Sequence, residues 1–276
     1  MHWIVQENVR DEATYDAFIA ALRDQNVEHS VVKIIPFSHE TIPDVNPTGR
    51  VVVWGSTTLD LVAKNKGWKP GTFLNENHDQ RVWTEAYGRE NMLNGDAEYY
   101  EFCKVPAFDG VRFIRPVEDM KVFAGTLIHG TELAHWQVQT LALADSFSTL
   151  TPKTVVSVSM PKDILTEWRF FVVAGKVVTG AMYRWGGKLY QHGRADLEDV
   201  TWGFAQTMVD KWAAAEAFVI DIATIRAPEC TDWDQCPTFY DGCNCFFSKV
   251  IEVNCINSCG FYDADMGAVV KAIEAL

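Results

Sequence analysis

The sequence pattern that most constrains the fold is a pair of apolar, β-branched and aromatic segments that only two residues separate. The first segment, Trp-Arg-Phe-Phe-Val-Val, covers residues 168–173, and the second covers residues 176–183, after Ala174 and Gly175. Two such segments joined by a two-residue turn that contains glycine predict a β-hairpin. The second half of the chain is therefore expected to contain antiparallel sheet.

The first part of the chain alternates between strand and helix patterns. Residues 11–24 place apolar side chains at i, i+3, i+4 and i+7, which is the spacing of one helical face. Short apolar runs predict strands at residues 4–5, 31–35 and 51–54. A Gly-Ser-Thr-Thr turn at residues 55–58 leads into a second helix, for which Gly67 is the expected C-cap. Alternating strands and helices are typical of a parallel α/β unit, and we expect it to occupy residues 1–105.

The rest of the chain mixes further strands and helices with the hairpin. Strands are expected at residues 111–116, 155–159, 218–222 and 249–253. Helices are expected at residues 131–145, 199–212 and 265–276. The sequence therefore predicts an α/β (α+β) fold with a second domain at residues 106–276.

Composition and charge exclude some classes of function. The 276 residues are 48% hydrophobic and carry a formal net charge of −13, so a sizeable core is possible and nucleic acid is an unfavourable partner. No apolar run approaches the roughly 18 residues that a membrane-spanning helix needs. The first residues lack a basic segment followed by an apolar one. We therefore expect no signal peptide, a cytoplasmic location and mostly reduced cysteines.

Two carboxylates lie inside apolar strands. Asp221 interrupts the run Phe-Val-Ile-Asp-Ile, and Glu252 interrupts the run Val-Ile-Glu-Val, two positions before Asn254. The strand period of two places Glu252 and Asn254 on the same face. Three hard oxygen ligands next to phosphate oxygens suit Mg²⁺, whereas carboxylates at a solvent-facing sheet edge need no metal. The spacing alone leaves both interpretations open.

Four cations lie near the ends of predicted strands. They are Arg115, Lys121, Arg169 and Arg184. Positive charges grouped at strand ends can neutralise a triphosphate and the charge that develops when a phosphoryl group is transferred. Each of these side chains, taken alone, is also compatible with an ordinary surface charge.

Several short motifs occur in the order found in a known family. They are Arg115-Pro116 followed by Lys121, Glu167-Trp168-Arg169, Asp221, Glu252-Val253-Asn254 and Gly260-Phe261-Tyr262. Together they resemble the ATP-grasp superfamily, in which an acidic strand precedes a strand of the form E-x-N. They are most similar to the clade named for one arginine and two lysines, known mainly from bacteria and their phages as predicted peptide or amide ligases. The resemblance implies an ATP-grasp fold with a preceding α/β domain.

This resemblance implies roles for individual residues. The residues implied to be catalytic are Lys121, Arg169 and Arg184. Those implied to bind ATP are Arg115, Lys121, Ser159, Met160, Asp163 and Glu167. Those implied to hold Mg²⁺ are Asp221, Glu252 and Asn254. In this arrangement the backbone of Ser159 and Met160 contacts adenine, and Asp163 reaches the ribose.

The implied activity is the ATP- and Mg²⁺-dependent ligation of a small-molecule or peptide carboxylate to an amine through an acyl phosphate. Two other classes of protein stay open. The first is an ATP-dependent kinase or a non-ligating nucleotide-binding regulator of the same fold, and the second is a zinc-stabilised interaction module. Homodimers are common in the superfamily, so a homodimer is one expectation for this chain.

The sequence also departs from the family pattern. The expected phosphate loop at residues 117–125 contains one glycine, Gly125, where many relatives have several. Arg115 stands where a lysine is usual, and its planar guanidinium binds phosphate with a different geometry. The second lysine of the clade has three candidates, Lys153, Lys176 and Lys188.

A cysteine-rich insert is predicted at about residues 226–247, between the two acidic strands. It contains Cys230, Cys236, Cys243 and Cys245, and Cys255 and Cys259 follow the second strand. Four thiolates can hold structural zinc, although these spacings differ from those of a common zinc ribbon. Buried free thiols in a loop packed by aromatic residues are the alternative.

Overall fold

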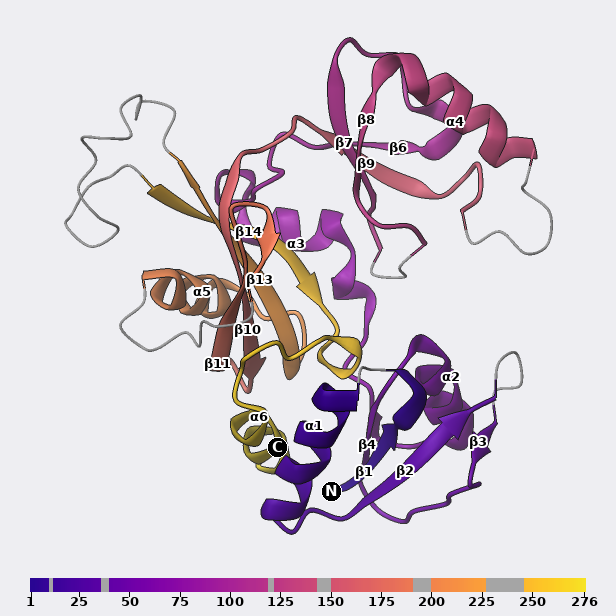
Figure 1. Cartoon of the computed structure of the whole chain (residues 1–276), viewed down its shortest axis with the longest axis vertical. Coiled ribbons are helices and arrows are strands. Elements are labelled where there is room, and N and C mark those ends of the chain that lie inside the picture. Colours follow the sequence, from indigo (N-terminus) through magenta and orange to yellow (C-terminus); the bar gives the residue numbers. More distant parts are fainter. Residues whose placement is uncertain (10–11, 36–39, 119–121, 143–149, 191–199, 227–245) are drawn as a thin grey trace.

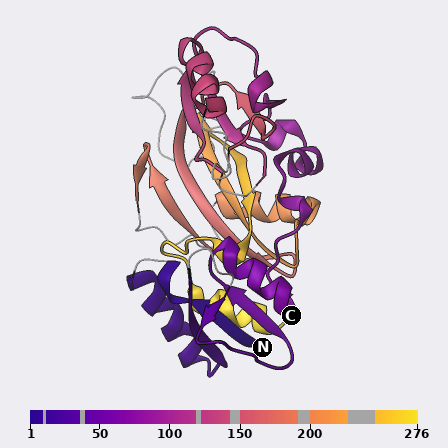
Figure 2. The same cartoon turned by 90° about the vertical axis from the view of Figure 1, so that its right-hand side faces the viewer.

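The computed structural model describes residues 1–276 except 10–11, 36–39, 119–121, 143–149, 191–199 and 227–245. The described strands form three sheets that follow one another along the long axis of the molecule (Figures 1 and 2). We call them the N-terminal sheet (β1 to β5), the upper sheet (β6 to β9) and the central sheet (β10 to β14), which lies between the other two.

The N-terminal sheet has the strand order β3-β2-β1-β4-β5. Its strands are β1 (His2–Gln6), β2 (His29–Ile34), β3 (Thr41–Ile42), β4 (Val51–Trp54) and β5 (Pro70–Gly71). Strand β1 pairs in parallel with both β2 and β4, which confirms the predicted parallel α/β unit. The connecting helices are α1 (Glu12–Asp24) and α2 (Thr57–Lys66). Gly67 caps α2 with a φ of 69°, a left-handed conformation that glycine adopts without strain.

The upper sheet is antiparallel, with the strand order β6-β9-β7-β8. Its strands are β6 (Glu98–Glu101), β7 (Val111–Pro116), β8 (Thr126–His129) and β9 (Val155–Ser159). Helix α4 (Gly130–Ala142) packs Leu133 and Trp136 into a core with Phe102 and Ile114. Strand β6 belongs to this sheet although it precedes residue 105, and the predicted division into two domains at that residue stays a prediction.

The central sheet has the strand order β12-β11-β10-β13-β14. Its strands are β10 (Ile164–Val173), β11 (Lys176–Trp185), β12 (Lys188–Leu189), β13 (Ala217–Arg226) and β14 (Phe246–Asn254). The predicted hairpin is confirmed, because β10 and β11 pair antiparallel on either side of Ala174 and Gly175. These two residues have φ values of 50° and 72°, as a tight hairpin turn with two left-handed positions requires.

The two faces of the central sheet pack against different elements. Phe170 and Val172 face a core that includes helix α5 (Val200–Lys211), whereas Phe171 and Val173 face a core shared with Phe18 of α1. The last helix, α6 (Met266–Glu274), packs beside α1, so the end of the chain returns to the N-terminal sheet (Figure 1). Successive side chains of β10 thus point to opposite faces of the central sheet, and each face packs against a different layer.

The short helix α3 (Gln80–Tyr87) belongs to the segment that connects the N-terminal and upper sheets. This segment also lies against the central sheet, because the backbone N–H of Leu93 donates to the carbonyl oxygen of Val250 at 2.8 Å. It therefore reaches the region where the upper and central sheets meet.

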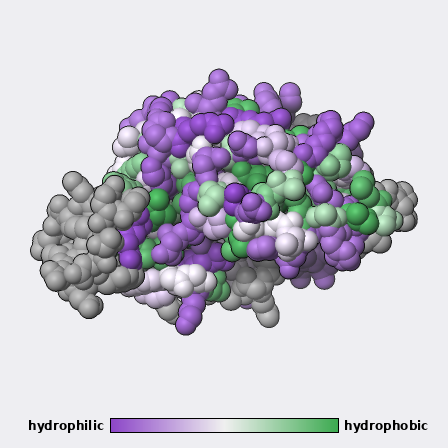
Figure 3. Space-filling model, turned by 90° about the horizontal axis from the view of Figure 1, so that it is seen from above, coloured by the Kyte–Doolittle hydropathy of each residue, from purple (hydrophilic) through white to green (hydrophobic). Residues whose placement is uncertain are grey.

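The surface at the upper-sheet end carries hydrophilic and hydrophobic residues interspersed with one another (Figure 3). Exposed apolar side chains here include Leu127 on β8 and Val138 on α4, which are 60% and 64% exposed. Within the residues that the structure describes, no helix is long and apolar enough to cross a membrane.

Candidate nucleotide and metal site

A cavity of about 490 Å³ lies where the upper and central sheets approach each other. Its walls include Phe113 and Arg115 of β7, Glu167 of β10, and Ile251 and Glu252 of β14. Apolar walls with a few convergent charged groups are typical of sites that bind small molecules.

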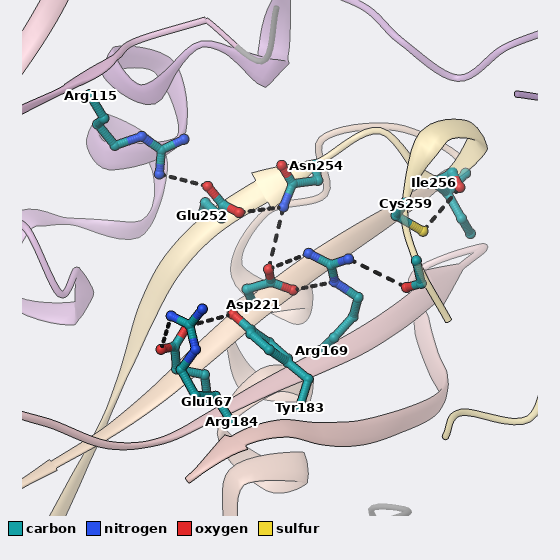
Figure 4. A network of polar contacts seen from close by, with 11 residues as sticks. Arg115, Glu167, Arg169, Tyr183, Arg184, Asp221, Glu252, Asn254, Ile256 and Cys259 are labelled. Atoms are coloured by element: carbon teal, nitrogen blue, oxygen red, sulfur yellow. Dashed lines mark hydrogen bonds and ion pairs between the residues drawn. The ribbon is translucent and has the colours of Figure 1, made fainter. Parts of the chain in front are cut away.

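The three residues predicted to hold a metal lie side by side. Asp221 of β13 and Glu252 of β14 are direct cross-strand partners, and Asn254 follows two positions later on β14. The side-chain Nδ2 of Asn254 donates to Glu252 Oε1 at 2.8 Å and to Asp221 Oδ2 at 3.4 Å (Figure 4). Glu252 and Asn254 line the cavity, whereas Asp221 is completely buried behind them.

Arg169 is the partner of the buried Asp221. It is the cross-strand neighbour of Asp221, and its Nε and Nη2 donate to the two carboxylate oxygens at 2.9 and 2.7 Å. Burial raises the pKa of Asp221 to about 6, against the opposing effect of Arg169. Burial also disfavours the charged guanidinium, but the attraction of Asp221 outweighs it and raises the pKa of Arg169 well above its ordinary value. Arg169 lies behind the cavity wall, and its predicted catalytic role stays a prediction.

Arg115 connects the upper sheet with the central sheet. Its Nη1 lies 2.7 Å from Glu252 Oε2, and both side chains are largely buried. Burial alone opposes ionisation of Glu252, but Arg115 and the hydrogen bond from Asn254 together lower the pKa of this carboxyl below its ordinary value. Glu252 is therefore a carboxylate at neutral pH, as a metal ligand has to be.

Glu167 lies in the cavity wall between two donors. Tyr183 Oη donates to its Oε2 at 2.8 Å, and Arg184 Nη1 donates to its Oε1 at 2.9 Å (Figure 4). All three residues line the cavity. Burial is the main cause that raises the pKa of Tyr183 well above its ordinary value, so its hydroxyl keeps its proton. This arrangement fixes Glu167 and leaves half of the Arg184 side chain accessible.

Two tyrosines cover Arg169. Tyr183 and Tyr262 stack with ring centroids 4.8 Å apart, and the Arg169 guanidinium lies 5.6 and 5.1 Å from the two centroids. Tyr262 adopts a φ of 55°, a conformation that a bulky residue takes only at a cost in free energy. The motifs in the sequence indicate no role for Tyr183, although its place next to Arg184 on a predicted hairpin strand is a signal for one.

The residues predicted for the base and ribose lie at the end of β9 and in the short connection that leads to β10. Ser159 is buried, and its hydroxyl donates to Asn94 Oδ1 at 3.2 Å. The side chain of Met160 is half exposed and lines the cavity. Asp163 is exposed and lies outside the cavity lining, so its predicted contact with the ribose stays a prediction.

The lysines of the predicted phosphate site are only partly placed. Lys121 lies outside the described residues. The three candidates for the second lysine of the clade, Lys153, Lys176 and Lys188, are exposed and do not line the cavity. Lys162 does line it, and the sequence analysis missed it, although it follows the predicted strand 155–159 by only three residues.

The zinc hypothesis gains no support. The predicted ligands Cys230, Cys236, Cys243 and Cys245 lie outside the described residues. Cys255 and Cys259 are buried, and their thiols donate to Asn257 Oδ1 at 3.5 Å and to the carbonyl oxygen of Ile256 at 3.1 Å. In the described parts of the chain, no three His, Cys, Asp or Glu side chains gather in a way that could hold a metal. The predicted magnesium set differs in kind, since its third member is an amide and phosphate oxygens complete it.

Comparison with known families identifies the class of protein that this fold and site define. Residues 101–272 match the model of an ATP-grasp domain family, the second family of the clade named for one arginine and two lysines. The chain therefore belongs to this family, which confirms the resemblance that the motifs indicated. A comparison with curated proteins gave no significant match.

Solved structures of similar fold extend over the whole chain. D-cycloserine synthetase DcsG superposes with a TM-score of 0.62 at 10% identity, covering 99% of this chain and 98% of that chain. A RimK domain ATP-grasp protein from Sphaerobacter thermophilus gives 0.60 at 9% identity, covering 99% and 100%. D-alanine–D-alanine ligase from Bacillus anthracis complexed with ATP gives 0.55 at 13% identity, covering 100% and 91%. At these identities the likeness establishes the fold, including the part that precedes residue 101, and function needs a separate argument.

Proposed function

We propose that this protein is an ATP- and Mg²⁺-dependent ligase that joins a carboxylate to an amine through an acyl phosphate. The observation that carries the proposal is the set of side chains at the end of β14 and in the cavity next to it. Glu252 and Asn254 line this cavity, together with Arg115 and Arg184. Oxygen ligands next to cations are the arrangement that a nucleoside triphosphate with magnesium requires.

The residues present fit a magnesium ion. Glu252 is a carboxylate at neutral pH, and Asn254 uses its Nδ2 for the two neighbouring carboxylates, which leaves its Oδ1 for a cation. Asp221, the third predicted ligand, is completely buried behind them and accepts from Arg169 with both carboxylate oxygens, so Glu252 and Asn254 supply the part of the set that faces the cavity. When bound, Mg²⁺ would neutralise phosphate charge and orient the phosphate that is transferred.

The remaining predicted residues are each proposed to contact a different part of the nucleotide. In this proposal Arg115 and Lys121 bind the phosphates, and Glu167 faces the nucleotide from β10. Ser159 and Met160 lie at the base, and Asp163 lies nearest the ribose. Arg115 has the additional task of keeping Glu252 ionised, because the two side chains form an ion pair.

The reaction takes place in two steps. A carboxylate oxygen of the substrate attacks the γ-phosphorus of ATP, the bond to the β,γ-bridging oxygen breaks, and ADP leaves. In this proposal Arg184 neutralises the transferred phosphoryl group, and the accessible part of its side chain at the cavity wall supports this role. An amine then attacks the acyl carbon, phosphate leaves, and the amine loses a proton.

The proposed substrate class is supported by the names of proteins with a similar fold. The structures of similar fold include a D-cycloserine synthetase, a D-alanine–D-alanine ligase and the ligase PsnB complexed with a minimal precursor. For the present chain we propose an amino acid, another small molecule or a peptide as the source of the carboxylate and of the amine.

An isotope experiment tests the proposed chemistry. The protein, MgATP and pools of candidate acids labelled with ¹⁸O in the carboxylate are incubated with pools of amines, and the released phosphate is analysed by mass spectrometry. We expect ADP formation that needs both an acid and an amine, with ¹⁸O appearing in the phosphate. A kinase would instead form ADP with an acceptor alone and leave the label out of free phosphate. Glu252→Gln is the control, which should form no ADP.

A further inference from the structure

One polar side chain that lines the cavity, that of Asn94, is not among the residues that the proposed function uses. Asn94 lines the cavity although the residue is only 5% exposed. Its Oδ1 accepts a hydrogen bond from Ser159, and among the described residues no hydrogen bond uses its Nδ2. Most of this residue is buried, but its Nδ2 stays accessible, because the described side-chain N and O atoms that are buried without a hydrogen-bond partner do not include it. Asn94 is therefore oriented for a partner inside the cavity.

The backbone of the neighbouring Met160 already has partners within the protein. Its N–H donates to Asp96 Oδ2 at 2.9 Å, and its carbonyl oxygen accepts from Lys162 Nζ at 3.2 Å. Lys162 also donates to Asp96 Oδ1 at 2.8 Å, so the two side chains hold this backbone position together. A base at this end of the cavity would thus obtain specific hydrogen bonds from a side chain rather than from the backbone of Met160.

The surroundings of Asn94 suit a flat ring with a polar edge. Leu93, Met160, Ile164 and Ile251 supply apolar parts of the wall of the same cavity. The position of Asn94 is fixed relative to β14, because the preceding residue donates its N–H to the backbone of that strand. Apolar faces and one polar edge are what a purine base presents.

We propose that the side chain of Asn94 reads the edge of adenine and makes this protein select ATP over GTP. This inference rests on the proposed function, since it takes ATP to be the nucleotide. The amide oxygen accepts a hydrogen bond from the 6-amino group, and the amide nitrogen donates to the adjacent ring nitrogen. A carboxylate in the same place cannot donate to that ring nitrogen, so it loses this hydrogen bond to adenine, whereas the ring N1–H of guanine can donate to it.

Calorimetric titrations with MgATP and MgGTP test the proposal on the wild type, Asn94→Asp and Asn94→Ala. The preference for ATP over GTP should fall about tenfold or more in Asn94→Asp, the size expected for one two-bond contact between an amide and a base. Asn94→Ala should bind MgATP more weakly but bind inorganic triphosphate with magnesium as the wild type does. The matched control is Asn91→Ala, because Asn91 lies on the same segment, donates to the carbonyl oxygen of Tyr87 and lies outside the cavity lining.

Two results would overturn the proposal. If both Asn94 variants weaken ATP and GTP by the same factor, Asn94 supports the segment without reading the base. If neither variant changes the binding of ATP, the side chain has no contact with the nucleotide. A wild type that binds neither nucleotide would instead refute the proposed function itself, so the two failures are distinguishable.

Discussion

Replacement of Arg169 by methionine should strongly destabilise the fold, because it leaves a carboxylate buried without its cation. Asp221 is completely buried and receives two hydrogen bonds from Arg169, at 2.9 and 2.7 Å. Removal of one partner of a buried ion pair costs about 3–5 kcal/mol. The free energy of unfolding of ordinary domains is only about 5–15 kcal/mol, so the variant should be marginally stable.

The loss should depend on pH in a defined direction. The pKa of Asp221 is about 6 in the folded wild type and 3.8 as its ordinary value, and removal of Arg169 raises the folded pKa further. Folded Asp221 in the variant therefore holds a proton at pH values where that of the wild type is ionised. By linkage, the difference in unfolding free energy should be larger at about pH 8 than at about pH 5.

Urea unfolding followed by circular dichroism at both pH values measures this difference. Lys33→Met is the control, since Lys33 forms an exposed ion pair with Glu7 and should contribute less than about 1 kcal/mol. The double variant Arg169→Met/Asp221→Leu should regain much of the lost stability, because it removes the stranded charge. An Arg169→Met variant within about 1 kcal/mol of wild type at pH 8 would refute the reasoning.

Three further predictions concern the same network. Glu252→Gln should abolish magnesium-dependent ATP turnover and leave the fold intact, as turnover assays and circular dichroism would establish. In the wild type, the lowered pKa of Glu252 adds to the free energy of unfolding at pH values above 4.5, the ordinary pKa of a glutamate. This added stability is lost as the pH falls through the pKa of the folded state. Arg115→Met should remove that contribution, so an acid titration of its unfolding free energy should be flatter in this range. Tyr183→Phe should lose roughly 1–2 kcal/mol in urea unfolding, because its hydroxyl donates to a carboxylate.

Local patterns in the sequence predicted the elements on which the site is built. The two-residue turn at Ala174 and Gly175 specified the hairpin, and both residues have the positive φ that the turn needs. The period of two placed Glu252 and Asn254 on one face, and both line the cavity. Periodicity is a property of the local backbone, so one sequence is enough to detect it.

Contacts that depend on strand register lay beyond the sequence. The pairing of Arg169 with Asp221 requires β10 and β13 to be neighbours in one specific register, and irregularities at Glu167/Trp168 and Asp221/Ile222 shift the registers nearby. Such shifts move side chains from one face to the other, and no motif records them. The sequence therefore identified Arg169 as important without revealing that it lies behind the cavity wall.

Residues from the connecting segment were missed for a different reason. Asn94 reaches the cavity, and Asp96 bonds Met160 and Lys162 at its edge, because their segment forms a backbone hydrogen bond with β14, more than 150 positions later. Neither residue belongs to a motif or a periodic element, so no sequence signal marked either of them for a place at the site. Lys162, by contrast, had a signal in its position three residues after a predicted strand.

Isothermal titration of ATP into the protein, with Mg²⁺ and with a chelator, tests the central claim most directly when Glu252→Gln is titrated in parallel. The account predicts micromolar binding in magnesium that weakens about tenfold or more, both when the metal is removed and in the variant. Binding of equal strength in all three titrations, or no binding in any of them, would contradict the assignment of Glu252 and of the cavity to magnesium and ATP.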